Sequence, residues 1–135
     1  MDAGVVRLVV AGVIGAHGIG HVLGWLPALG VIRLEGTAGE SWLISGIAGD
    51  GGSRLVATVM FLVPTVGFVA AAIGLLTGQP WWRQAAVGSA AVSLAGTALF
   101  PHAFPAGSTV GSVAVNVAIL GGILVLGWGA DGAAI

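Results

Sequence analysis

The chain has 135 residues, of which 57% are hydrophobic and 7% charged, and its mean hydropathy is +1.08. A soluble domain carries about 25% charged residues, so this composition excludes an ordinary water-soluble fold and predicts the lipid bilayer as a partner. The net charge of −1 argues against a nucleic-acid-binding surface. Cysteine is absent, which excludes disulfides and thiolate chemistry.

Four apolar segments follow one another, each with roughly the 20 residues that cross a hydrocarbon core. Four strands cannot close a barrel, so these segments are expected to be helices. The first should end before Pro27, and the fourth should begin at Ser108, a candidate N-cap. The sequence thus predicts an all-α polytopic membrane protein, an antiparallel four-helix bundle forming one domain over residues 1–135. The expected spans cover about residues 5–26, 54–77, 82–100 and 108–128.

The longest connection, residues 27–53, is called the first loop. It holds three of the five acidic residues and ends in GDGGS, which predicts a flexible turn. Inside it, the stretch SWLISGIAG is apolar but too short to cross a membrane. We expect this stretch to rest on the mouth of the bundle as a re-entrant or interfacial segment.

Arginine placement gives a tie for orientation. Arg7 and Arg83 flank the side of the termini, whereas Arg33 and Arg54 flank the side of the first loop. We expect the termini to face the cytoplasm. The abundance of glycine, alanine and valine is typical of a prokaryotic protein, so a prokaryotic cell membrane is the expected location.

Small residues recur every four positions along the first segment, at Gly12, Ala16, Gly20, Gly24 and Ala28. Such a stripe allows two helix backbones to approach closely, which is how membrane helices associate in the absence of a hydrophobic driving force. We interpret the stripe as a packing face rather than a ligand groove.

Polar side chains stand at the same depth in two of the apolar segments. His17 and His21 lie one turn apart on one helix face, with Trp25 continuing the row, and Asn116 lies well inside the last segment. His102, between two prolines, is expected at the mouth on the same side. Polar groups at this depth usually face protein or a water-filled cavity. We expect one polar pocket in the loop-side half of the bundle, roofed by the first loop.

Several functions fit such a pocket. The groups can simply bond one another and hold the bundle together. His17, His21 and His102 are candidate metal ligands, since histidines four apart can chelate one ion, although the glutamate of the metalloprotease signature is missing. Haem would need one of the first two paired with His102, because axial ligands approach the iron from opposite faces.

A quinone or another lipid-like ligand needs the fewest additional assumptions. A neutral imidazole can donate a hydrogen bond to a carbonyl oxygen and exchange protons with water at the mouth. In this hypothesis His21 is the donor and His102 relays protons to water. Flat apolar walls are expected from Trp25, Phe100 and Phe104. The alternative from another class is a non-catalytic accessory subunit of a larger membrane complex, or a homo-oligomer. Whether the protein is an enzyme stays open at this stage.

The first segment, VVRLVVAGVIGAHGIGHVLGWLP, resembles the opening helix of the DoxX-like family of small four-helix membrane proteins. The matching positions are Arg7, Gly12, Gly18 and His21, where the family has an arginine, an apolar run with glycine, and Gly-x-x followed by a basic residue. The resemblance covers the first segment alone. It implies a quinone-linked redox accessory role, like that of the thiosulfate:quinone oxidoreductase subunits.

Overall fold

A computed structural model describes residues 2–35, 37 and 39–128, and its regular secondary structure is helical, with no β-strand in these ranges. This confirms the all-α fold. Three helical segments, Ala3–Ala28, Ile44–Leu76 and Ala106–Val125, are long and apolar enough to cross a membrane. The elements are α1 (Ala3–Gly20), α2 (Val22–Ala28), α3 (Ile44–Leu76), α4 (Trp82–Leu99), α5 (Ala106–Leu120) and a π-helix, η1 (Gly121–Val125).

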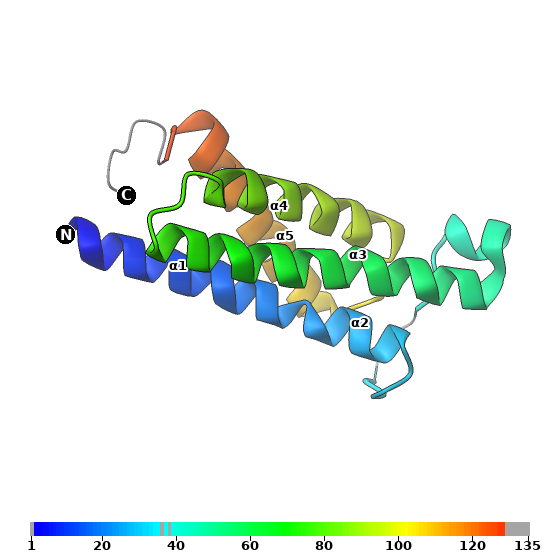
Figure 1. Cartoon of the computed structure of the whole chain (residues 1–135). Helices are drawn as coiled ribbons and strands as arrows, with labels where there is room; N and C mark the ends of the chain where they lie inside the picture. Colours follow the sequence, from blue (N-terminus) through cyan, green and yellow to red (C-terminus); the bar gives the residue numbers. More distant parts are fainter. Residues whose placement is uncertain (1, 36, 38, 129–135) are drawn as a thin grey trace.

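The helices run alternately up and down. Figure 1 shows α1 and α3 side by side and antiparallel, with α4 packed against α3 and α5 crossing behind. The start of α1 and the end of η1 lie at the same end of the molecule (Figure 1). The neighbour of α5 is α4, and α5 makes little direct contact with α1. The bundle is therefore open along the seam between α1 and α5.

Three helix boundaries differ from the sequence prediction. Pro27 does not stop the first segment but lies inside α2, and the fourth helix begins at Ala106, with Pro105 rather than Ser108 at its N-cap. The predicted flexible turn GDGGS is helical except at Gly49, whose φ of 67° and ψ of 179° kink α3. Glycine tolerates this backbone conformation because it has no Cβ. The kink divides α3 into a short helical turn, which begins at Ile44, and the long helix that follows Gly49.

The apolar stretch of the first loop closes the end of α4. The Ser41 hydroxyl donates to the carbonyl oxygen of Leu99 at 2.7 Å, and the Trp42 indole N–H donates to that of Ala98 at 2.8 Å. The last carbonyls of a helix have no partner within the helix, so these two bonds satisfy groups that would otherwise be unpaired. The start of the stretch thus contacts the mouth of the bundle as expected, whereas residues 46–49 are exposed.

The small-residue stripe forms a packing face only at its end, where Gly24 and Ala28 of α2 are buried, and not along α1. A Cβ added at Gly12 or Gly20 would meet no atom within 4 Å, and Ala16 is exposed. On α1 the close approach occurs at Gly18, where an added Cβ would lie 2.7 Å from Cβ of Phe68. The contact face of a helix is set by its neighbours, and here it lies on another side of α1 from most of the stripe.

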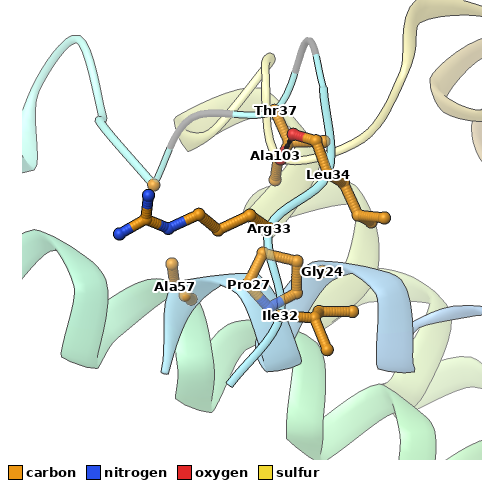
Figure 2. Close-up of a pocket in the computed structure, with 10 residues that line it drawn as sticks. Gly24, Pro27, Ile32, Arg33, Leu34, Thr37, Ala57 and Ala103 are labelled. Carbon is orange, nitrogen blue, oxygen red and sulfur yellow. Dashed lines mark hydrogen bonds between the residues drawn. The ribbon is translucent and has the colours of Figure 1, made fainter. Parts of the chain in front are cut away.

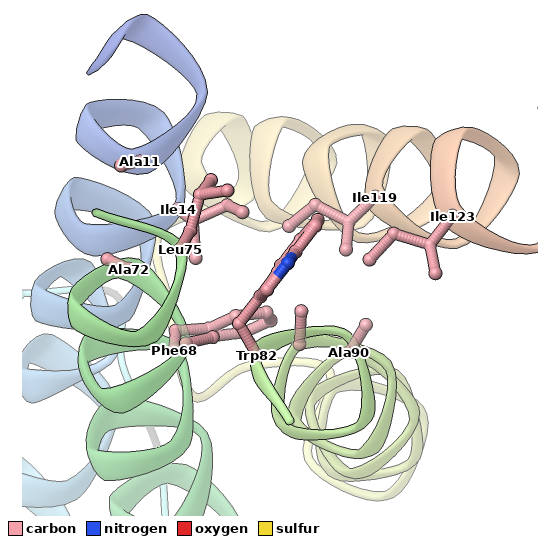
Figure 3. Close-up of a cluster of buried hydrophobic side chains, with 11 residues drawn as sticks. Ala11, Ile14, Phe68, Ala72, Leu75, Trp82, Ala90, Ile119 and Ile123 are labelled. Atoms are coloured by element: carbon pink, nitrogen blue, oxygen red, sulfur yellow. The ribbon is translucent and has the colours of Figure 1, made fainter. Parts of the chain in front are cut away.

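Two apolar clusters fill the interior. The larger one joins α1, α3, α4 and α5, and Figure 3 shows the indole of Trp82 reaching from the start of α4 between Ile14 and Ile119. The smaller cluster, near the first loop, is built around Phe61, Phe100 and Phe104. Large apolar side chains also cover the outer surface, among them Leu8, Ile19 and Val66, each more than 60% exposed. A surface of this kind fits contact with lipid chains rather than water.

Candidate functional site

Four polar side chains from three helices form a closed set of hydrogen bonds in the interior. Nε2 of His17 lies 3.0 Å from Oδ1 of Asn116, whose Nδ2 donates to Oγ of Ser93 at 2.8 Å. Oγ of Ser93 lies 2.6 Å from Nε2 of His21, and Nδ1 of His21 lies 2.9 Å from the carbonyl oxygen of His17. We call these four residues the polar ring. It links α1, α4 and α5 near the middle of the bundle.

The acceptors fix the direction of every bond in the polar ring. A carbonyl oxygen only accepts, so His21 carries its proton on Nδ1, and in the neutral ring Nε2 then accepts from the hydroxyl of Ser93. The amide oxygen of Asn116 likewise only accepts, so His17 carries its proton on Nε2. The two histidines are therefore opposite tautomers one turn apart.

The polar ring also explains why the first segment is divided into α1 and α2. The backbone N–H of His21 bonds to the carbonyl oxygen of Gly18 at 3.1 Å, three residues back instead of four. The side chain of His21 then donates to the carbonyl oxygen of His17, the acceptor that a regular helix would give to that N–H. A side-chain bond thus replaces a backbone bond at the break.

A cavity of about 340 Å³ lies beside the polar ring, in the seam between α1 and α5. We call it the seam cavity. Both histidines of the polar ring line it, and Phe104 forms one of its walls. Small exposed residues surround it, so it communicates with the outer surface of the bundle. Its lining residues are Ala16, His17, Gly20, His21, Leu23, Phe104, Ser108, Gly111, Ser112 and Val115.

The structure brings together three of the five residues proposed from the sequence. His17, His21 and Asn116 belong to the polar ring. Trp25 points elsewhere, because its indole N–H donates to the hydroxyl of Thr65 on α3 at 3.2 Å. His102 is exposed in the turn between α4 and α5 and does not line the seam cavity. The proton relay through His102 that the sequence suggested is therefore not supported by this arrangement.

The sequence reasoning missed Ser93, which is fully buried and is the central member of the polar ring. A signal was present, since Ser89, Ser93 and Thr97 recur every four residues and so share one face of α4. All three are buried, which marks that face as the inner one.

The first loop covers a different pocket from the one expected. A pocket of about 260 Å³ lies between the loop and α2, and Figure 2 shows Arg33, Leu34 and Thr37 of the loop above Pro27 and Ala57. It contains none of the histidines. The seam cavity instead faces the side of the bundle, so the prediction of a histidine pocket roofed by this loop is wrong.

Three of the four ring nitrogens of His17 and His21 already form hydrogen bonds, which leaves one of the four free to bind a metal ion. Both ring nitrogens of His21 and one of His17 take part in the polar ring. Within the ranges that the structure describes, no three histidine, aspartate or glutamate side chains gather as a metal site. The three candidate metal ligands are thus not brought together there.

What the arrangement offers chemically is a neutral, hydrogen-bonded wall beside an apolar opening. Among the described residues, the polar side-chain groups at the cavity include Nδ1 of His17, which has no hydrogen-bond partner, and the exposed hydroxyl of Ser108. The hydroxyl of Ser112 is buried beside the cavity, also without a partner. No protein-family model matches the chain, and neither a curated protein nor a solved structure matches it.

Proposed function

We propose that this protein is a small integral membrane protein whose seam cavity binds the polar head of a quinone-type or other lipid-like ligand. The observation that carries the proposal is the polar ring standing beside a cavity that opens sideways between two membrane-spanning helices. A polar group near the middle of a bilayer is costly, and such groups commonly mark binding sites or pathways.

The size and walls of the seam cavity suit such a head group. Ligand pockets typically measure about 300–1,000 Å³ and combine apolar walls with a few polar groups, and about 340 Å³ falls within that range. Phe104 and Leu23 supply apolar walls, and His17 supplies the polar edge. Contact with the ligand falls to His17 instead of His21, because both nitrogens of His21 are bonded within the protein. The donor role suggested for His21 becomes an acceptor role at His17, whose free nitrogen Nδ1 carries no proton.

A second cavity continues the seam towards the other end of the bundle. It measures about 240 Å³, its lining is almost entirely apolar, and Val115 lines both cavities. Ile14 and Trp82 form its inner wall, and Trp128 lies at its far end. A polar head in one cavity and an apolar tail in the next match the shape of an amphiphile. The resemblance of the first segment to DoxX-like proteins favours a quinone-type molecule among such ligands.

The proposal includes a fourth span. α4 has 18 residues and a length of about 27 Å, close to the thickness of a hydrocarbon core of about 30 Å. Its lower apolar content comes partly from Arg83 and Gln84 in its first turn, at the end of the proposed span. It also comes from hydroxyl residues such as Ser89 and Ser93, which are buried and so do not face lipid. We propose four spans in a prokaryotic cell membrane, with the termini in the cytoplasm.

Binding of a decyl-substituted benzoquinone and of its hydroquinone to the protein in lipid nanodiscs tests this function. Calorimetric titration against empty nanodiscs measures the saturable part. In the Gly111→Phe variant the new ring enters open space at the cavity, and in the matched Gly88→Phe variant it enters open space on α4. We expect saturable binding of at least one form, abolished by Gly111→Phe and retained by Gly88→Phe.

Two results would overturn the proposal. The first is that neither form binds saturably to the wild-type protein, as expected of an accessory subunit with no ligand. The second is that the Gly111→Phe variant binds the ligand as tightly as the Gly88→Phe variant. The second result would place the ligand outside the seam cavity.

A further inference from the structure

The seam cavity presents a hydrogen-bond acceptor that nothing in the described part of the chain satisfies. His17 uses Nε2 to donate to Asn116, so in the neutral ring Nδ1 carries a lone pair. No described residue bonds to Nδ1. His17 is only partly buried, and its side chain lines the seam cavity, which is the side from which a ligand would reach this atom.

The other members of the polar ring keep Nδ1 an acceptor. If the Asn116 amide were turned over, its nitrogen would donate to His17 and Nδ1 would become an N–H. The hydroxyl of Ser93 would then donate to Asn116 and accept from Nε2 of His21. Nδ1 of His21 already donates to the carbonyl oxygen of His17, so His21 would carry a second proton and a positive charge. Its exposed fraction of 2% in an apolar bundle makes that charge costly.

Nδ1 of His17 is an unpaired acceptor near the middle of the membrane, so a ligand that donates a hydrogen bond to it would be stabilised. His17 lies near the centre of the span Ala3–Ala28, where the bilayer supplies no hydrogen-bonding group. A carbonyl-only head group cannot satisfy Nδ1, because it has no proton to give. A hydroxyl can, since it both donates and accepts.

A second unsatisfied group lies beside the same cavity. Oγ of Ser112 is buried and has no partner among the described residues, and Ser112 lines the seam cavity. Rotation about its Cα–Cβ bond can turn the hydroxyl towards the cavity. One ligand hydroxyl can then donate to Nδ1 of His17 and accept from Ser112, which satisfies both groups.

We propose that the seam cavity selects an amphiphile with a hydroxyl head, such as a hydroquinone or a phenol, over the matching carbonyl compound. His17 is the acceptor that makes this choice, and Ser112 is the second contact. This inference rests on the proposed function, and it names the chemical form of the ligand that the site prefers.

Three probes with the same decyl chain test the preference in nanodiscs kept free of oxygen. They are the hydroquinone, its benzoquinone and the hydroquinone dimethyl ether, which can accept but not donate. We expect the hydroquinone to bind about tenfold more tightly than either of the others, the effect of one hydrogen bond to an otherwise unpaired group. Ser112→Ala leaves the polar ring intact and should weaken hydroquinone binding about threefold to tenfold.

Histidine ¹⁵N resonances give a readout that does not depend on affinity, because the chain has only three histidines. Hydroquinone should shift the Nδ1 resonance of His17 and leave the two resonances of His21 in place. If quinone or dimethyl ether binds as tightly as hydroquinone, and Gly111→Phe still abolishes binding, the inference is wrong while the proposed function stands. If no probe binds saturably, the proposed function fails first.

Discussion

Nδ1 of His21 donates to the carbonyl oxygen of His17 at 2.9 Å, in place of the backbone N–H that a regular helix would use. The same side chain accepts from Ser93 through Nε2. One residue thus divides α1 from α2 and ties that division to α4. The irregular helix geometry and the polar ring are two consequences of the same side chain.

Opposite tautomers of His17 and His21 are the first prediction. In the absence of ligand, ¹⁵N NMR of histidine-labelled protein at neutral pH should show His17 protonated on Nε2 and His21 protonated on Nδ1, both neutral. The reason is that each proton points at an oxygen that can only accept. A charged His21, or the same tautomer at both positions, would contradict the arrangement of the polar ring.

Ser93→Ala should destabilise the protein by about 1–2 kcal/mol. The change leaves Nε2 of His21 and Nδ2 of Asn116 without their partner in a dry interior, although the range stays modest because membrane-embedded groups find substitutes. Thermal unfolding in detergent measures the effect. Ser89→Ala is the matched control, because it removes a buried hydroxyl from the same face of α4 without touching the polar ring. Equal loss in both variants would argue against a special role for Ser93.

Gly18→Ala should destabilise the contact between α1 and α3 by about 1–3 kcal/mol. The new methyl would lie 2.7 Å from Cβ of Phe68 and 3.2 Å from the carbonyl oxygen of Thr65, so the two helices must move apart. Gly12→Ala is the control, since nothing lies within 4 Å of its added Cβ, and it should be neutral or slightly stabilising. The same thermal assay compares them, and a harmless Gly18→Ala would show that the helices are not held this closely.

A cysteine-scanning experiment tests the fourth span. The chain has no native cysteine, so Gln79→Cys and His102→Cys each introduce one reactive thiol, at opposite ends of α4. If α4 crosses the membrane, a membrane-impermeant maleimide added to intact cells should label only one of the two variants. After the membrane is permeabilised, both should react. Labelling of both variants in intact cells would mean that α4 does not cross.

The sequence predicted the membrane class from composition alone. It also predicted the inward placement of His17, His21 and Asn116, because a polar side chain that faces lipid is costly wherever its neighbours lie. It did not predict which face of a helix meets a neighbour. Gly12 and Gly20 carry the spacing of a packing stripe, yet they face outwards, since the contact face depends on the positions of the other helices. Ser93 was overlooked for the same reason, because its partners lie on two other helices.

His102 illustrates a further limit of sequence reasoning. The flanking prolines placed it in the turn between the third and fourth segments, and it does lie there, but they did not determine which way its side chain faces. In the structure its side chain is exposed. Among the described residues, it forms no hydrogen bond with the polar ring.

The most direct test of the central claim is a density map of the protein in nanodiscs saturated with decyl hydroquinone. The account predicts head-group density in the seam cavity, within hydrogen-bonding distance of Nδ1 of His17, with the chain running towards Trp82 and Trp128. Density for the head group beneath the first loop near Arg33, or a seam filled only by lipid tails, would contradict it.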